Sequence, residues 1–530
     1  MKIILPNLIT SVEEGSAAAV PQALERLRLP ERAVVSAHLA RTSVDARRGR
    51  VRFVSSVCVE VSDEGAALLQ KRRGLRYTPV SEGVPAFPHG EERLGTRPVV
   101  IGLGPGGLFA ALLLARHGYR PLVLERGGDV DSRAAAVGRF WEQGAFDPVS
   151  NVQFGEGGAG TFSDGKLVTR IHDPLCRLVL EEFVRHGAPE EVLVRAKPHV
   201  GTDRLRAVVR SLRGEIVSLG GEVRFFTQAE EFRIRGGRLC GIRAAGAEIG
   251  AQAAILACGH SARDTFEALA QSGAALAAKP FSVGVRIEHL QSAVDRALYG
   301  DFAGHPNLPK GEYQLSHRRG DGRAAYTFCM CPGGQVVAAA SEAGGVVTNG
   351  MSAYARDGRN ANAALVVSVS QADFGDGWRG GIALQRQIEA AAFAAGGNNY
   401  RAPAQTVGSF LQTGKETFGA VVPTYPLGVT DADLGALFPP QVTSMLREAL
   451  PLFGRRQAGF DDPAAVLTGA ETRTSSPVRI LRGGDGCAVG LDGLYPCGEG
   501  AGYAGGITSA AVDGLRCAAA LMRRFAPPRL

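Results

Sequence analysis

The sequence contains no long uninterrupted run of apolar residues. Spanning a bilayer needs a run of about eighteen apolar residues, and no such run occurs among the 530 residues. The first residues, MKIILPNLITSVEEG, lack the apolar core and small-residue cleavage site of a signal peptide. We therefore expect a cytoplasmic protein without a membrane partner.

Cysteine clusters and metal-binding motifs are also missing. The nine cysteines do not repeat at the spacing of a disulfide framework or of paired CxxC zinc ligands, and no HExxH motif occurs. We expect reduced thiols and no metal site. Cys329 and Cys331 are close in sequence, but alternate residues of a strand do not bring their sulfurs into disulfide geometry, so we interpret them as structural.

Lysine is scarce, and basic residues do not form a run. The formal net charge of +7 comes from arginines spread along the chain. Nucleic-acid binding normally requires basic residues gathered on one face, so nucleic acid is not an expected partner. The basic balance and a separate N-terminal unit leave a non-catalytic, flavin-dependent or RNA-associated binding protein open as an alternative.

Apolar residues and glycine, in contrast, are abundant. Hydrophobic residues make up 45% of the chain, and 70 residues are glycine. A chain of this length can bury large cores and divides into two or three domains. The glycines occur in discrete turns between Val-, Leu- and Ile-rich strands, which indicates positional roles rather than disorder.

A glycine-rich turn after residue 101 predicts a dinucleotide site. In RPVVIGLGPGGLFAALLLARHG, the residues Gly102, Gly104 and Gly107 fit GxGxxG between an apolar strand (98–101) and an apolar helix (108–117). The three glycines allow a tight turn, close approach of a pyrophosphate and close helix packing. Pro105 and Gly106 complete the predicted turn.

An acidic residue follows the next strand (121–124) at the expected offset. Glu125 is placed to accept hydrogen bonds from ribose hydroxyls, and Arg126 joins the same predicted site. This unit predicts a bound dinucleotide but does not distinguish FAD from NAD, because both share the adenosine-diphosphate geometry.

The C-terminal segment LYPCGEGAGYAGGITSAAVDGLRCAAALM resembles the flavin signature of the glutathione-reductase-like class. The resemblance implies that Glu499, where Asp is more usual, binds the ribityl chain after Gly498. It also implies that the helix after Gly505, Gly506 and Ile507 directs its N-terminus at the flavin. A positive helix end there would stabilise the negative charge of reduced flavin.

Two further glycine segments predict contacts with the cofactor. The loop NVQFGEGGAGTFSDGKLVTR should lie close to its middle, and the strand-to-helix turn at Gly259 in ACGHSARD resembles the AxG turn at which such flavoproteins return to the adenosine diphosphate. Lys166 in this loop either holds a flavin or substrate oxygen as a cation or is an ordinary solvated lysine. The predicted contacts of the loop are Gly157, Gly158, Gly160, Ser163, Asp164, Gly165 and Lys166.

Motifs over most of the chain, among them EGGAGTFSDGKL, KPFSVGVRIEH, FCMCPGGQVV and ETRTSSPVR, resemble a bacterial family of FAD-dependent dehydrogenases of uncertain substrate. The resemblance supports FAD as the cofactor. We expect an α/β protein with a Rossmann-like FAD-binding domain that is discontinuous in sequence. The expected parts are a ferredoxin-like α+β domain (1–75), a linker (76–96), the FAD-binding domain (97–275 and 471–530) and a mixed α+β substrate-side domain (276–470).

Three residues are the candidates for catalysis: Lys166, Arg473 and Tyr503. A guanidinium in GAETRTSSPVRI could clamp a substrate carboxylate or phosphate, and the alternative is an ion pair at the domain junction, which we expect for Arg479 rather than Arg473. Tyr503 could cover the flavin, donate a proton or simply pack.

These patterns predict an FAD-dependent dehydrogenase or reductase. Hydride would pass through flavin N5 to or from a small metabolite, which is anionic if the arginine clamp holds, and NAD(P)H is a candidate electron donor. No second GxGxxG unit marks a separate site for that donor. The alternative enzyme is a flavin monooxygenase using NAD(P)H and O2, because ACGHSARD is similar to the DG-type turn of aromatic hydroxylases, although Cys258 replaces the Asp.

Overall fold

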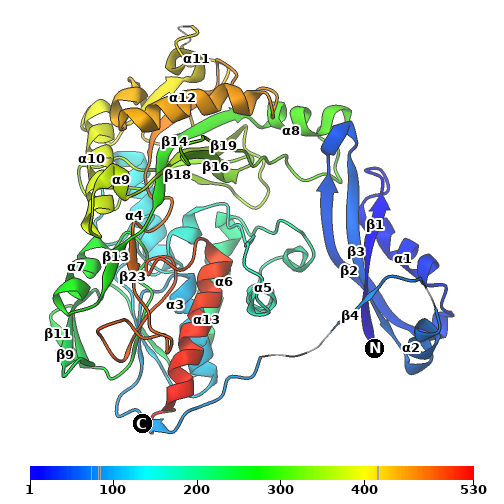
Figure 1. Cartoon of the computed structure of the whole chain (residues 1–530), viewed down its shortest axis with the longest axis horizontal. Coiled ribbons are helices and arrows are strands. Elements are labelled where there is room, and N and C mark those ends of the chain that lie inside the picture. The colour runs from blue at the N-terminus through cyan, green and yellow to red at the C-terminus, as the bar shows by residue number, and fades with distance from the viewer. Residues whose placement is uncertain (73, 81–82, 84, 415–416, 530) are drawn as a thin grey trace.

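The computed structural model describes the chain apart from residues 73, 81, 82, 84, 415, 416 and 530. Its largest sheets have four, five and seven strands, and each belongs to a different part of the molecule (Figure 1). None of the described helices is long and apolar enough to cross a lipid bilayer.

The four-stranded sheet is formed by the N-terminal residues, which lie to one side of the molecule (Figure 1). Its antiparallel strands follow the order β2-β3-β1-β4, and the elements follow one another as β-α-β-β-α-β. Alternate residues of β1 and β3, such as Ile3 and Val57, are buried against the first helix. The elements are β1 (Lys2–Thr10), α1 (Ala19–Leu27), β2 (Val34–Asp45), β3 (Arg52–Val61), α2 (Asp63–Gln70) and β4 (Thr78–Pro79).

The five-stranded sheet is parallel, and its order β24-β12-β6-β7-β8 brings β24, from near the C-terminus, beside strands from the first half of the chain. Three of the strands are short apolar runs that are buried on both faces, as parallel strands usually are. The strands are β6 (Val99–Ile101), β7 (Leu122–Leu124), β8 (Glu222–Arg224), β12 (Ala254–Leu256) and β24 (Leu494–Pro496).

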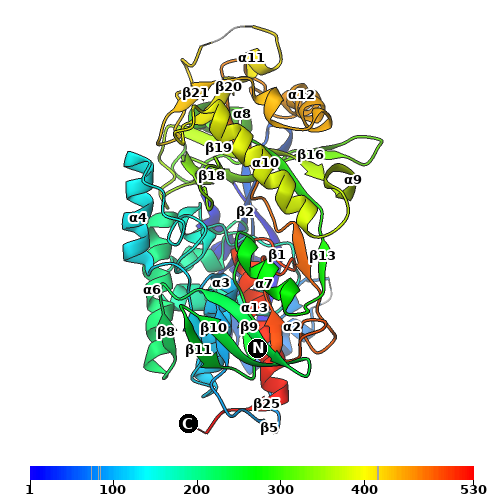
Figure 2. The ribbon, with the colours of Figure 1, turned by 90° about the vertical axis from the view of Figure 1, so that its left-hand side faces the viewer.

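Different elements cover the two faces of this sheet. Helices cover one face, and an antiparallel three-stranded sheet with a further helix covers the other (Figure 2). The helices on the first face are α3 (Pro105–Arg116), α5 (Leu175–Arg185), α6 (Thr202–Ser218) and α13 (Ile507–Arg524). The elements on the second face are β9 (Ala229–Arg235), β10 (Arg238–Ala244), β11 (Ala247–Gly250) and α7 (Arg263–Gln271).

The region after residue 280 contains the seven-stranded sheet, with the order β15-β16-β19-β14-β22-β20-β21. Its longest strands, β14 and β19, are each ten residues long. Both strands are buried on both faces: in β14, Val283 and Ile287 face the apolar core, whereas the charged residues Arg286 and Glu288 at the alternate positions are buried as well. The strands are β14 (Phe281–Leu290), β15 (Ser316–Arg318), β16 (Ala324–Cys331), β19 (Asn360–Val369), β20 (Ala402–Thr406), β21 (Val429–Asp431) and β22 (Val466–Glu471).

Two long helices pack on the seven-stranded sheet (Figure 2). They are α10 (Arg379–Ala395) and α12 (Pro440–Gly454), which contains Pro451 in its last turn. The remaining elements are β5 (Glu92–Arg93), α4 (Val130–Gln143), β13 (Leu276–Ala278), α8 (Gln291–Tyr299), β17 (Gln335–Ala338), β18 (Thr348–Met351), α9 (Gln371–Phe374), α11 (Val407–Phe410), β23 (Val478–Ile480) and β25 (Phe525–Ala526).

The expected linker (76–96) includes two short strands. Strand β4 extends the N-terminal sheet, and β5 pairs with β25 at the C-terminal end of the chain. Residues 81, 82 and 84 of the expected linker lie outside the described residues. The N-terminal unit also contacts the rest of the chain, because Thr42 donates from its N–H to the Val194 carbonyl (2.7 Å) and accepts from the Ala196 N–H (2.8 Å).

Helices α3 and α13 pack backbone to backbone through glycine. A Cβ at Gly514 would lie 2.1 Å from the carbonyl oxygen of Gly106, so only glycine fits at this crossing. The crossing fixes the two helix N-termini relative to each other. We predict that Gly514→Ala forces the helices apart and lowers the thermal midpoint, at a cost of about 1–3 kcal/mol.

Gly214→Ala is the matched control, because Gly214 lies in α6 with no atom within 4 Å of a Cβ. It should leave the midpoint unchanged or raise it, since alanine favours a helix over glycine by about 1 kcal/mol. Equal midpoints for Gly514→Ala and wild type would contradict the close packing.

Candidate active site

One large cavity lies at the carboxyl ends of β6, β12 and β24 and extends toward the seven-stranded sheet. Its volume of about 1730 Å³ exceeds the range of roughly 300–1,000 Å³ typical of small-molecule sites, so it has room for more than one ligand. Residues predicted to bind the cofactor line it, except Gly107, Gly157 and Gly165. The three candidates for catalysis, Lys166, Arg473 and Tyr503, line it as well.

The glycines of the first turn differ in what surrounds them. Gly102 has φ +94°, and a Cβ there would lie 2.4 Å from the Ala257 carbonyl oxygen. A Cβ at Gly107 would lie 1.9 Å from the carbonyl oxygen of Gly102. Gly107 therefore packs against the turn itself and does not line the cavity. At Gly104, in contrast, only Cα of Gly158 comes within 4 Å, at 3.7 Å, so the space above this residue is open.

Helix α3 begins directly after this open space. Its N-cap is Gly104, which offers no capping side chain, and Pro105 occupies the first turn. The free N–H groups of such a helix end attract anions. The turn can therefore hold a pyrophosphate with its backbone alone.

Glu125 lies at the end of β7 and is buried at the edge of the cavity. Its carboxylate accepts from the backbone N–H groups of Leu103 (2.7 Å), Gly127 (2.9 Å) and Gly155 (2.9 Å). The acid therefore holds two loops together, in addition to the predicted ribose contact. The neighbouring Arg126 lies over the ring of Phe154, 4.4 Å from its centre.

The loop with Gly158 and Gly160 passes beside the turn, but its polar residues are already engaged. Ser163 donates to the Gly160 carbonyl (2.7 Å), and the Asp164 carboxylate accepts from the guanidinium of Arg356 (2.9 Å). Lys166 is 3.1 Å from Glu312. The predictions for Asp164 and Lys166 did not anticipate these protein partners, because Arg356 and Glu312 come from sequence segments more than a hundred residues away.

The C-terminal turn presents a second open helix end to the cavity. A Cβ at Gly505 or Gly506 would meet no atom within 4 Å, and Gly506 has φ +122°. No side chain caps α13, which begins at Ile507. Gly259 is similarly open on the opposite turn.

Glu499 precedes this helix and lines the cavity. Burial raises the pKa of its carboxyl to about 7, although the nearby Lys279 lowers it. The side chain can therefore exchange a proton near neutral pH at the point where the sequence predicts a ribityl contact.

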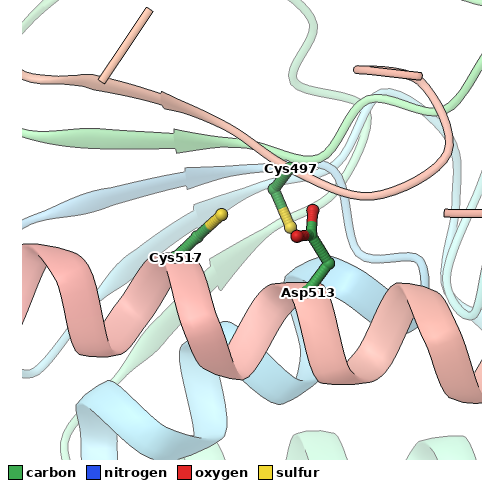
Figure 3. A group of neighbouring side chains, drawn as sticks. All are labelled: Cys497, Asp513 and Cys517. Atoms are coloured by element: carbon green, nitrogen blue, oxygen red, sulfur yellow. The ribbon is translucent and has the colours of Figure 1, made fainter. Parts of the chain in front are cut away.

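A buried polar cluster anchors the Gly498 turn from behind (Figure 3). Asp513 and Cys517 project from α13, and Cys497 follows β24; their ligand-type atoms lie within 4.8 Å of one another. Asp513 accepts from the Gly498 N–H (2.7 Å) and from the guanidinium of Arg482 (3.0 Å). Because this guanidinium already neutralises the carboxylate and donates to Cys517, the cluster supports the turn without needing an ion.

The arginine prediction requires a correction. Arg473, rather than Arg479, forms the buried ion pair: its Nε lies 2.8 Å from Glu389, and a second nitrogen donates to Ser261 (2.9 Å). Within the described part of the chain, Arg479 has no ion pair and instead donates to the Gly502 carbonyl. Arg473 is thus restrained by protein atoms.

The other candidates also have protein contacts. Tyr503 is partly exposed, its ring lies 3.6 Å from the guanidinium carbon of Arg482, and its hydroxyl accepts from that residue's N–H (3.1 Å). Cys329 and Cys331 are free thiols in β16, and burial raises the pKa of Cys331 to about 11. His260 is buried, and burial together with nearby cations lowers its pKa to about 3, so it is neutral and has no charged acid–base role near pH 7.

Three comparisons bear on this geometry. Residues 280–474 match a family model described as "FAD-dependent protein, C-terminal domain-like". The whole chain is 43% identical over 534 residues to a protein of Clostridium beijerinckii described as an uncharacterized protein, with 100% of both chains covered.

Solved structures are more distant. A glycine oxidase of Geobacillus kaustophilus is similar over 81% of this chain and 95% of its own, with 12% identity and a TM-score of 0.35. An L-amino acid deaminase of Proteus vulgaris is similar over 85% of this chain and 94% of its own, with 11% identity and a TM-score of 0.34. Likenesses at this level assign no activity.

Glu389 should be essential for the fold around Arg473. It also lies 3.2 Å from Arg263, so Glu389→Gln leaves two buried guanidinium groups short of a counter-charge. We predict a loss of about 3–5 kcal/mol, seen as a lower thermal midpoint. The control Glu267→Gln breaks an exposed pair with Arg379 and should cost at most about 1 kcal/mol; similar losses in both variants would show that the Glu389 pairs are not specially stabilising.

The raised pKa of Glu499 predicts a pH-dependent stability. Between about pH 4.5 and 7 the folded protein holds a proton that the unfolded chain releases, so its stability falls as the pH rises through this window. Glu499→Gln cannot ionise and escapes the loss, which amounts to at most about 3 kcal/mol. The midpoint of the variant minus that of wild type should therefore grow from pH 5 to pH 8; a constant difference would contradict the shift.

Proposed function

We propose that this chain, which belongs to one family of FAD-dependent proteins with the Clostridium protein, is an FAD-dependent dehydrogenase or reductase. The proposed reaction transfers hydride between the flavin and a small metabolite. The observation that carries this proposal is the convergence of two uncapped helix N-termini, those of α3 and α13, on one cavity.

The residues of the cavity fit FAD. The open space above Gly104 accommodates a pyrophosphate, and the open space at Gly505 and Gly506 accommodates a planar ring at the other helix end. Glu125 and Glu499 lie at the positions where ribose and ribityl hydroxyls are expected. Bound FAD supplies hydride transfer at N5, a chemistry that amino-acid side chains lack.

The protein residues provide orientation, charge and exclusion of water. The N-terminus of α13 favours negative charge on a ring placed beside it, and Glu499, with a pKa near neutrality, can hold or release a proton there. The seven-stranded sheet closes the far side of the cavity through β14 and β16. These features suit a redox reaction on a small molecule.

The proposed domains follow the sheets. The parallel sheet and its helices form a Rossmann-like FAD-binding domain (97–275 and 471–530), and the seven-stranded sheet forms the substrate-side domain (276–470). The N-terminal unit (1–75), together with β4 from the expected linker, has the β-α-β-β-α-β order of a ferredoxin-like domain. A cytoplasmic location and NAD(P)H as the electron donor remain parts of the proposal.

The variant Gly104→Ala tests FAD binding separately from the stability of the fold. Gly104 has φ −73°, which alanine adopts freely, and its Cβ would meet no protein atom closer than 3.7 Å. The added methyl group would, however, occupy space proposed for the pyrophosphate. We predict FAD binding at least about tenfold weaker, or about 1.4 kcal/mol, with an unchanged midpoint of the apoprotein.

Fluorescence titration of the apoprotein with FAD measures this loss, and Gly138→Ala in α4, where a Cβ meets no atom, is the control. Equal FAD affinity in wild type and Gly104→Ala would contradict the proposed pyrophosphate position. The oxidoreductase itself is tested by anaerobic mixing of the holoprotein with NADH, NADPH and a metabolite panel. Bleaching of the flavin by at least one reductant, followed by reoxidation with an acceptor, supports the proposal; no bleaching by any of them contradicts it.

A further inference from the structure

Two lysines, Lys166 and Lys197, share the carboxylate of Glu312 in one part of the cavity, which is called its substrate end below. The Nζ atom of Lys166 lies 3.1 Å from Glu312, and that of Lys197 lies 2.8 Å from the other oxygen of the same carboxylate. All three residues line the cavity. One positive charge is therefore left without a counter-charge.

The backbone brings the two lysines together although 31 positions separate them in the sequence. The Leu167 N–H donates to the Pro198 carbonyl (2.9 Å), and the Val200 N–H donates to the Gly165 carbonyl (3.1 Å). On its other side the segment is braced by the N-terminal unit, whose Thr42 pairs with residues 194–196. The pair is thus built on paired backbone rather than on a free loop.

The surrounding charges do not cancel the excess. Asp164, the other acid whose charge acts on Lys166, is paired with Arg356. Arg170 and Arg318 line the same cavity and have no ion pair among the residues that the structure describes. The cavity lining therefore offers further cations that no carboxylate of the described residues pairs with.

Glu312 and Lys166 both stay ionised at neutral pH. Burial raises the pKa of Glu312, but Lys166 and Lys197 together outweigh burial and bring it to about 2. Burial lowers the pKa of Lys166, and Glu312 and Asp164 more than offset that effect. The arrangement is therefore a carboxylate between two ammonium groups over the physiological range.

We propose that Lys166 and Lys197 form the anchor for an anionic group of the substrate, a carboxylate or a phosphate, with Glu312 as the internal counter-charge that the anion partly replaces. This inference rests on the proposed function and names its substrate class. It also moves the predicted anion clamp away from Arg473, whose guanidinium is held by Glu389 and Ser261. An anion bridging two ammonium groups gains two charge-assisted hydrogen bonds.

The test is calorimetric titration of the FAD-loaded protein with acetate, oxalate and inorganic phosphate, with acetamide as the neutral probe. At least one anion should bind and acetamide should not, and the preferred anion separates carboxylate from phosphate recognition. Lys197→Gln and Lys166→Gln should each raise the Kd about tenfold. Glu312→Gln should lower the Kd, because it removes the competing carboxylate.

Lys310→Gln is the matched control, since Lys310 is an exposed lysine outside the cavity lining. Its Kd should equal that of wild type. The lysine variants should raise the Kd, whereas Glu312→Gln should lower it. This result would exclude a purely structural ion pair, because loss of such a pair would weaken binding in every variant. Absence of anion binding, or a Kd unchanged in Lys197→Gln and Glu312→Gln, would overturn the inference.

Failure of the proposed function gives a different result. A protein that is not an oxidoreductase fails to bleach with any reductant, whatever its anion affinity. A protein that bleaches normally yet binds no anion retains the proposed function and loses this anchor. The flavin readout and the calorimetric readout therefore fail separately.

Discussion

The structure depends on the close crossing of α3 and α13. Gly106 and Gly514 allow the two backbones to touch, and this contact fixes two helix N-termini at one cavity. Neither end is capped by a side chain, and glycines leave the space in front of both open. The parallel sheet, with its discontinuous strand order, holds the crossing in place. In the function proposed above, anion binding and control of flavin charge follow from the same two helix dipoles.

Charge is distributed differently at the two ends of the cavity. Near the cofactor turns, guanidinium groups are paired: Arg473 with Glu389, and Arg482 with Asp513. These pairs stabilise loops and are restrained by several hydrogen bonds. At the substrate end, two lysines share Glu312 and leave a net positive charge. The difference separates side chains that hold the protein together from those available to a ligand.

The sequence predicts the glycine turns that line the cavity because their signal is local. GxGxxG between a strand and a helix, and the glycines before Ile507, each depend on backbone geometry within a few residues. The seven-stranded sheet could not be predicted in the same way, since its neighbouring strands, such as β14 and β22, come from segments far apart in the sequence. The partners of Lys166 and Arg473 are distant in sequence, and an Arg-rich chain offers many equivalent candidates, which is why Arg479 was wrongly preferred for the ion pair.

The central claim is that this paired-helix cavity holds FAD. The most direct measurement is to purify the protein, denature it by heat and identify and quantify the flavin released. The account predicts FAD, rather than FMN or riboflavin, at about one molecule per chain after saturation. Colourless protein that also fails to bind added FAD would contradict it.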